Sequence, residues 1–233
     1  MRTVRSMKST TRTVAATLGT ILVAGGLVSC AATSSDPGVS SGPSSTAEAT
    51  VDLSSLPVST MAASWVVDMG NPNKVAGLVD YVFVAHVISA DGTTYSNVVT
   101  MPVEGGGTKT VGTPMSHYTV EVIDNIKGKL KKNEPIPVTK EGGIAMDHKS
   151  IYLFEGDQFP QPGSYYIMMA SGQTDGSLLN IGGPGTTITL NATTKAEIVS
   201  SDTYKAYVKA VQNQIPLNMN RQHFKSKYDD SGA

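Results

Sequence analysis

Short runs of β-branched and aromatic residues, separated by turn-forming residues, constrain the fold of residues 61–233 more than any other feature. Six such runs follow one another, at residues 80–89, 118–126, 135–139, 164–171, 178–181 and 186–190. Short strands at regular spacing, with few charged residues, are typical of a small antiparallel barrel or sandwich. We therefore predict a single, mainly β domain over residues 61–233 that ends in a helix.

Helix signals lie at both ends of this domain. Asn71 and Pro72 suit the N-cap and the first position of a short helix that runs into the strand at 80–89. Thr194 and Glu197 have the spacing of a capping box, which opens a C-terminal helical stretch. The apolar residues of that stretch recur at helical spacing, at Tyr204, Val208, Val211 and Ile215.

The segments between the strands are predicted to be loops. Asp91 and Gly92 indicate a turn, and the polar, Gly-rich residues 92–114 indicate a long loop or an irregular hairpin. A second loop is expected over residues 141–163. The prolines within 135–139 favour a strand at the edge of the sheet.

The order of the strands resembles that of a bacterial surface module. It reads D-Y-V-F-V-A-H-V, Y-T-V-E-V-I-D-N-I-K-G-K, I-P-V-T, P-G-S-Y-Y-I-M-M and then a Gly-rich turn, over residues 75–190. Such modules have an OB-fold barrel similar to the netrin and tissue-inhibitor (NTR/TIMP-like) domain, and the resemblance implies an OB-like barrel here. The chain departs from the pattern at Ala85, Met168 and Met169. It also lacks the cysteines of the animal domains, so their inhibitory edge is not carried over.

The first 29 residues have the layout of a secretory signal peptide. Residues 1–12 hold four basic residues and no acid, and residues 13–29 are uncharged and weakly apolar. Leu27-Val28-Ser29-Cys30 then resembles the lipobox of bacterial lipoproteins. The resemblance implies cleavage after Ser29 and a diacylglyceryl group on the thiol of Cys30. Two acyl chains hold a protein stably at a membrane, whereas one holds it only marginally.

An alternative is that residues 13–29 remain as a transmembrane helix and Cys30 has no role. A stretch of 17 residues with three glycines makes a poor membrane span, so we favour the lipoprotein. Residues 30–60 are rich in Ser, Thr, Ala, Pro and Gly and are predicted to be a flexible linker. Gly38–Gly42 matches the G-x-S-x-G nucleophile pattern by chance, because such a linker has neither the strand nor the helix that the motif requires.

Charge and cysteine content exclude several classes of function. The chain has a formal charge of −1, which becomes about −5 without the leader, since the leader holds four of the 18 basic residues and no acid. An acidic mature chain gives no indication of nucleic-acid binding. One cysteine among 233 residues excludes an internal disulfide framework and a multi-thiolate metal site.

Candidate chemical groups are sparse. The four histidines are isolated from one another, at His86, His117, His148 and His223, and we expect His86 to be packed on a strand. Asp147 and His148, with Glu155 or Asp157, could contribute to a metal site, but no second spaced ligand pair is visible. Glu121 and Asp124 fall on opposite faces of a strand. Glu155 and Asp157 are predicted to be solvated acids of a turn.

The Gly-rich and basic segments have structural interpretations. Gly182–Gly185 lacks the Lys-Ser/Thr of a phosphate-binding loop, so we predict a turn with positive φ or a close strand crossing. The lysines near residue 130 indicate a solvated hairpin beside Glu134, although a weak role toward anionic headgroups or wall polymers stays open. These lysines are Lys127, Lys129, Lys131 and Lys132.

Taken together, these features predict a lipid-anchored protein on the outer face of the cell membrane, with Cys30 as its one assigned residue. We expect a non-enzymatic module that binds an envelope protein, peptide or polymer, with no cofactor, no metal and no nucleic acid. The alternative is an envelope hydrolase that acts on wall or glycan material through Asp147, Glu155 and Asp157. A structural spacer without a ligand is a third possibility.

Overall fold

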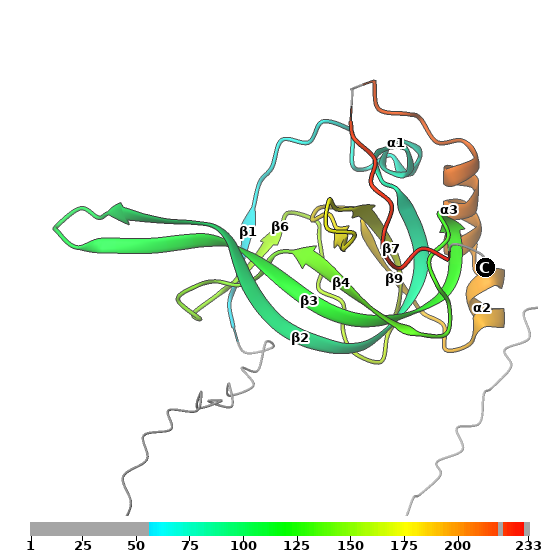
Figure 1. Ribbon diagram of the computed structural model, residues 1–233, viewed down its shortest axis with the longest axis horizontal. Helices are drawn as coiled ribbons and strands as arrows, with labels where there is room; N and C mark the ends of the chain where they lie inside the picture. The colour runs from blue at the N-terminus through cyan, green and yellow to red at the C-terminus, as the bar shows by residue number, and fades with distance from the viewer. Residues whose placement is uncertain (1–55, 219–220, 231–233) are drawn as a thin grey trace, which may run out of the picture. The chain divides into compact units, whose positions relative to one another are not determined.

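Five strands close into a ring in the computed structural model, which describes residues 56–218 and 221–230 (Figure 1). The leader 1–29, Cys30 and most of the linker lie outside the described residues. Around the ring, the order is β2 (Tyr81–Pro102), β3 (Thr108–Lys127), β4 (Pro135–Glu141), β8 (Leu178–Asn180) and β7 (Tyr165–Gly172), which returns to β2. Only the β4–β8 pair of the ring is parallel. This arrangement is that of a Greek-key OB barrel and confirms the predicted fold class.

Four further strands lie beside the ring. β9 (Thr187–Leu190) pairs with β7, while β1 (Val58–Met61), β6 (Ile151–Phe154) and β5 (Gly143–Ile144) form a separate small sheet. The prediction of a loop over 141–163 is therefore wrong for β5 and β6. The predicted linker is also too long at its end, because Val58 and the residues that follow it pair with β6.

The barrel interior is filled by the inward-facing residues of the ring strands. Tyr118, Val120 and Val122 alternate along β3, and they pack with Phe83 of β2 and with Met168 of β7. A second apolar cluster lies on the outer side of β2 and β7. The short regular spacing of strands predicted a barrel or sandwich, but it did not predict that two cores would share the same strands.

Three helices cover the second cluster (Figure 1). These are α1 (Pro72–Leu78), α2 (Lys195–Ser200) and α3 (Asp202–Gln212). The predicted N-cap at Asn71 and the capping box of Thr194 and Glu197 are confirmed. The C-terminal helical stretch is divided at Ser201, which ends α2 and caps α3. Within the described part of the chain, no helix is long and apolar enough to cross a membrane.

Two local expectations about the strands are wrong. Asp91 and Gly92 do not turn the chain, because they lie inside β2, at an irregularity in its pairing with β3. Strand β4 is not an edge strand, since it lies between β3 and β8. Its prolines are tolerated because β8 pairs only with Thr139 and Lys140, so the N-terminal half of β4 has one neighbour only.

The C-terminal segment 221–230 returns to one end of the barrel. The amide of Ser226 donates to the hydroxyl of Tyr81 at 2.8 Å, and Arg221 forms an ion pair with Asp80 at 3.0 Å. The backbone of Phe224 passes so close to Gly172 that a Cβ atom there would lie 2.0 Å from the carbonyl oxygen of Phe224. Gly172 therefore permits the contact between this segment and β7.

Replacing Gly172 with Ala should displace the C-terminal segment and lower the free energy of unfolding by about 1–3 kcal/mol, the usual cost of overpacking. Hydrogen exchange should accelerate at the amides of Ser226 and Lys227, and urea unfolding should shift to lower denaturant. Gly70→Ala is the matched control, because its added Cβ meets only the Asp68 carboxylate at 3.3 Å. Unchanged protection at Ser226 in the Gly172 variant would contradict the assigned contact.

Candidate functional site

A two-stranded ribbon extends beyond the barrel (Figure 1). We call residues 97–112 the β2–β3 arm. Beyond Asn97 the two strands keep an antiparallel register from Val99 opposite Val111 to Pro102 opposite Thr108. The tip is a turn over Gly105–Gly107, whose φ angles of 90–94° suit glycine. The expected long loop or irregular hairpin is thus a regular hairpin for most of its length.

The arm exposes four large apolar residues, of which Val98 is 51% exposed. Val99, Met101 and Val103 alternate along one face, and these residues are 51%, 44% and 39% exposed. Lys109 lies on the same face, directly opposite Met101. On the other face, the hydroxyls of Thr100 and Thr110 share a hydrogen bond of 2.9 Å. We call the exposed face with Val99, Met101 and Val103 the apolar strip.

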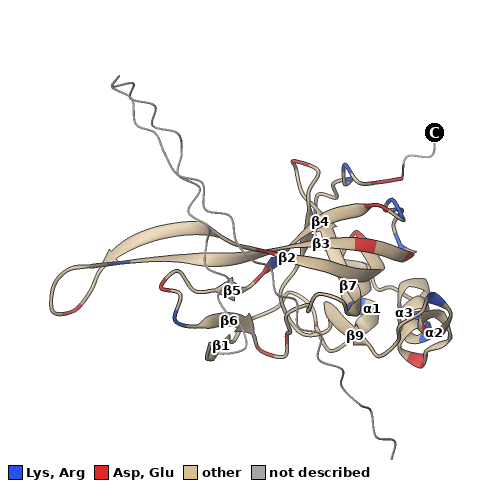
Figure 2. Ribbon diagram, turned by 90° about the horizontal axis from the view of Figure 1, so that it is seen from below, with Lys and Arg blue, Asp and Glu red and all other residues tan. Residues whose placement is uncertain are grey.

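No other named strand in the described part of the chain pairs with the edges of the arm. β7 pairs with β2 only from Tyr81 to His86, and β4 pairs with β3 only from Ser116 to Glu121. Among residues 56–218 and 221–230, no strand pairs with the outer edges of the arm, so their backbone donors and acceptors can pair with another strand. Its charged residues are Glu104 and Lys109, and Figure 2 shows the ribbon almost without charge.

The base of the arm is held by the small sheet. The hydroxyl of Tyr95 donates to the carbonyl of Ala145 at 3.3 Å, and Met115 forms an isolated bridge with Gly142. Further out, an isolated hairpin is marginally stable in water because it buries little apolar surface. The apolar strip is therefore the surface from which a partner would remove most apolar area.

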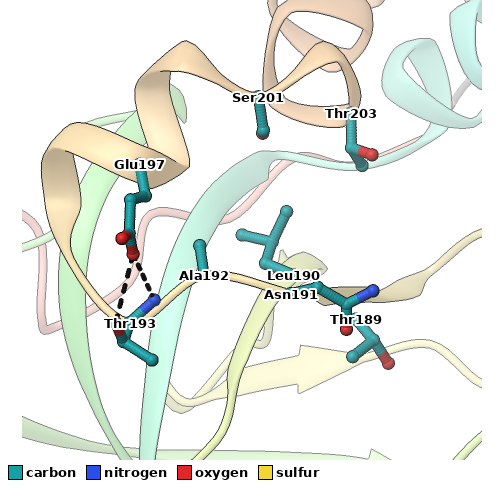
Figure 3. A pocket seen from close by; sticks show the side chains of 8 residues that line it. All are labelled: Thr189, Leu190, Asn191, Ala192, Thr193, Glu197, Ser201 and Thr203. Carbon is teal, nitrogen blue, oxygen red and sulfur yellow. Dashed lines mark hydrogen bonds between the residues drawn. The ribbon is translucent and has the colours of Figure 1, made fainter. Parts of the chain in front are cut away.

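An open pocket of about 540 Å³ lies between the end of β9 and helices α2 and α3 (Figure 3). Its lining is rich in hydroxyl groups, and the side chains of Leu190 and Ala192 point into it. Its one carboxylate, Glu197, already accepts hydrogen bonds from the amides of Thr193 and Thr194 at 2.9 and 3.1 Å. The carboxylate thus serves the N-terminus of α2, and the pocket lining offers no aromatic ring for a ligand.

A buried ion pair lies at the end of β4. The ammonium of Lys140 contacts both carboxylate oxygens of Asp157, at 2.8 and 2.9 Å, and both side chains are 1% exposed. Asp157 also accepts from the amide of Gly183 at 2.9 Å. The prediction that Asp157 is a solvated acid is therefore wrong. Alternation of Ile136 and Val138 with Lys140 along β4 places this lysine on the inner face.

The Gly182–Gly185 run contains glycines with positive φ, which is one of the two arrangements that the sequence predicted. Gly183 has a φ of 119°, and a Cβ atom there would lie 2.7 Å from the ring of Trp65. A Cβ on Gly182 would lie 2.2 Å from the ring of Phe154. Glycine at these positions lets two aromatic rings cover the loop that donates to Asp157.

The acids of the hydrolase alternative lie in different surroundings. Asp147 precedes β6 and Glu155 follows it, and four strand residues span about 13 Å. Glu155 is exposed, whereas Asp157 is turned inward onto Lys140. A glycosidase needs two carboxyl groups within about 5–10 Å of one another across a substrate. In the described part of the chain, no three His, Cys, Asp or Glu residues are grouped to hold a metal ion.

The histidines His86 and His117 have side-chain partners. His86 stacks on Tyr165 with ring centroids 4.7 Å apart, which agrees with the packed position that the sequence predicted. His117 lies between the hydroxyls of Thr94 and Thr139, at 2.7 and 3.2 Å. His148 is exposed and has a φ of 56° in the turn between β5 and β6.

Two of the lysines near residue 130 form hydrogen bonds within the fold, which the sequence did not predict. Lys127 donates to the carbonyls of Ala76 and Val79 at 2.7 and 2.6 Å, so it caps the C-terminus of α1. Burial lowers the pKa of this half-buried lysine. Lys132 bonds to Asp124 at 2.9 Å. The prediction of a wholly solvated cluster is therefore wrong for Lys127.

A comparison with known proteins finds no family model that matches the chain and no curated protein with significant similarity. The lipobox and the NTR/TIMP-like resemblance stay predictions from the sequence. Function must therefore be argued from the surfaces of this chain alone, and the arm is the most distinctive of them.

Sequence reasoning missed both the apolar strip and Lys140. The strip left a signal, because Val99, Met101 and Val103 alternate just before the Gly105–Gly107 turn. Lys140 left one too, because it continues the alternation of β4. Neither pattern identifies an exposed strip or a buried lysine unless the pairing of the strands is also known.

Asp124 of β3 accepts a hydrogen bond from Tyr204 of α3. This contact should make the free energy of unfolding depend on pH. Burial favours its protonated form, but hydrogen bonds from Tyr204 and Lys132 outweigh burial and hold the pKa of Asp124 below its usual value. A folded-state pKa below the unfolded one stabilises the protein above about pH 4, and that contribution is lost as pH falls through the folded pKa.

Asp124→Asn should therefore lower the free energy of unfolding by about 1–2 kcal/mol at pH 7 and flatten the loss of stability on acidification. The measurement is urea unfolding between pH 3 and pH 7, in about half-unit steps. Glu104→Gln, at the exposed tip of the arm, is the control and should follow the unmodified protein. If the free energy of unfolding of the Asp124 variant fell with acidification as steeply as that of the unmodified protein, the role assigned to Asp124 would be refuted.

Proposed function

We propose that the protein is a non-enzymatic binding module, anchored to the outer face of the cell membrane through Cys30, whose β2–β3 arm binds an envelope protein or peptide. The observation that carries the proposal is the apolar strip of Val99, Met101 and Val103 on a ribbon with free backbone edges. A partner strand would satisfy those edges and cover the strip in the same step.

The chemistry of the arm favours a protein or peptide over a polysaccharide. Apolar side chains gain most from burial against other apolar side chains, at about 25 cal/mol per Å². Sugar sites more often need an aromatic platform and convergent polar groups, and the described arm residues 97–112 include no aromatic residue. The low charge of the arm also disfavours electrostatic capture of anionic polymers.

Anchoring supports this role. A linker after Cys30 keeps a module near the membrane and free to reach partners within its span. The alternative of a hydrolase is disfavoured because Asp157, one of its three candidate acids, is buried in an ion pair with Lys140.

The arm is tested by replacing Val99, Met101 and Val103 with Thr, which keeps strand propensity but removes apolar area. Capture of proteins from intact envelopes should fall about tenfold or more relative to the unmodified protein. Thr100→Ser with Thr110→Ser, on the opposite face, is the matched control and should retain capture. Quantitative mass spectrometry reads out the captured proteins, and circular dichroism checks the fold.

An unchanged set of captured proteins in the triple variant would exclude the arm as the binding surface. If the unmodified protein, the triple variant and the control all captured the same wall polysaccharide, a protein or peptide would be excluded as the ligand.

The anchor is tested separately by Cys30→Ala in the producing cell. Without the thiol, no thioether can form, so labelling with a radioactive fatty acid should be abolished and the uncleaved precursor should accumulate. Ser29→Ala is the control, since it retains the thiol and a small residue before the cleavage point. Fatty-acid label on mature Cys30→Ala protein would contradict lipidation at Cys30.

A further inference from the structure

The barrel is closed by its shortest pairing. Strands β4 and β8 pair through only two residue pairs, Thr139 with Leu179 and Lys140 with Asn180. By contrast, β3 and β4 pair over six residues and β2 and β7 over six. Lys140 and Asn180 are direct neighbours across this short junction, which we call the β4–β8 seam.

Three reactive side chains meet at the seam. The Lys140 Nζ atom lies 3.2 Å from the carboxamide oxygen of Asn180 and 2.8 Å from the nearer oxygen of Asp157. Lys140, Asn180 and Asp157 are all almost completely excluded from solvent. An amine, a carboxamide and a carboxylate in this arrangement have the parts of an acyl-transfer reaction.

The surroundings activate each partner. Burial lowers the pKa of the Lys140 ammonium, so loss of its proton is easier than in water. The Asp157 carboxylate is in position to accept that proton. The Thr187 hydroxyl lies 3.2 Å from the Asn180 carboxamide oxygen and can donate to it, which polarises the carbonyl where negative charge would develop.

We propose that Lys140 and Asn180 form an intramolecular amide bond across the β4–β8 seam, with Asp157 as the proton-transfer group. This inference concerns the barrel itself and does not depend on the proposed function of the arm.

The reaction balances without any co-reactant. Asp157 takes a proton from the ammonium, and the neutral Nζ attacks the Cγ of Asn180. In the tetrahedral intermediate, Nζ carries two hydrogens; one is transferred through Asp157 to the carboxamide nitrogen, and the other stays on Nζ. The Cγ–Nδ2 bond then breaks, ammonia leaves, and an Nζ–Cγ amide remains. No electron is gained or lost overall.

Asn180 is a better acyl donor than Asp157 in this site. The Asp157 carboxylate forms an ion pair with Lys140, and it also accepts hydrogen bonds from the amides of Gln158 and Gly183 at 2.8 and 2.9 Å. An amine does not readily attack a carboxylate anion, whereas a neutral carboxamide is open to attack. The geometry thus assigns the acyl group to Asn180 and the base to Asp157.

A covalent bond here would fasten the part of the ring with the fewest backbone pairs. It would also close a loop between residues 140 and 180, which restricts the unfolded chain in the way that a disulfide does. A chain whose only cysteine is Cys30 has no internal disulfide with which to obtain that restriction.

The test is mass spectrometry of the full-length protein purified from its producing cell. Trypsin cannot cut after an acylated lysine, so the bond should yield a branched peptide of residues 133–149 and 150–195. Its mass should be about 17 Da below the sum of the two peptides, which is the loss of one ammonia. Fragmentation should place the junction at Lys140 and Asn180.

Two variants and one alternative product sharpen the test. Lys140→Arg, which keeps the positive charge but has no amine nucleophile, and Asp157→Asn, which removes the base, should both give ordinary linear peptides. A loss of about 18 Da with the junction at Asp157 would show the wrong acyl donor and overturn the assignment. Cleavage after Lys140 in the unmodified protein, with both linear peptides at full mass, would overturn the proposal altogether.

Discussion

The buried ammonium of Lys140 holds the barrel together where its backbone pairing is shortest. Its four acceptor atoms belong to three residues: Asp157 in the segment after β6, Asn180 in β8 and Thr187 in β9. The Gly182–Gly185 loop is fastened to the same group, because Gly183 donates to Asp157. A buried charge is costly unless it is paired and hydrogen-bonded, so these segments are constrained to meet at one point.

The distribution of apolar side chains distinguishes the barrel and its helix-covered outer side, where they are buried, from the β2–β3 arm, where they are exposed. The barrel interior and the helix-covered outer cluster bury the apolar side chains of β2, β3 and β7. The same two long strands, β2 and β3, continue beyond both cores. In that extension, Val99 and Met101 belong to neither apolar cluster and remain exposed. Of the nine exposed large apolar residues of the described chain, four lie on the arm.

Local sequence rules predicted the elements that depend on neighbouring residues. The Asn71 cap and the Thr194–Glu197 capping box depend on contacts within one helical turn, so their residue types suffice to predict them. The same rules were wrong at Asp91 and Gly92, because pairing with β3 extends β2 through a local turn signal. They were also wrong at Lys127, whose acceptors lie about 50 residues earlier in the chain.

The sequence by itself determined that the chain is mainly β, that its strands alternate inward and outward residues, and where α1 and α2 begin, because these properties depend on short-range periodicity and capping. It also holds the leader and Cys30 pattern from which anchoring is proposed. Only the tertiary structure decided that Lys140 meets Asn180 and Asp157, and that the arm leaves Val99, Met101 and Val103 uncovered. Those features depend on which distant strands pair and where their pairing stops, and local spacing does not specify either.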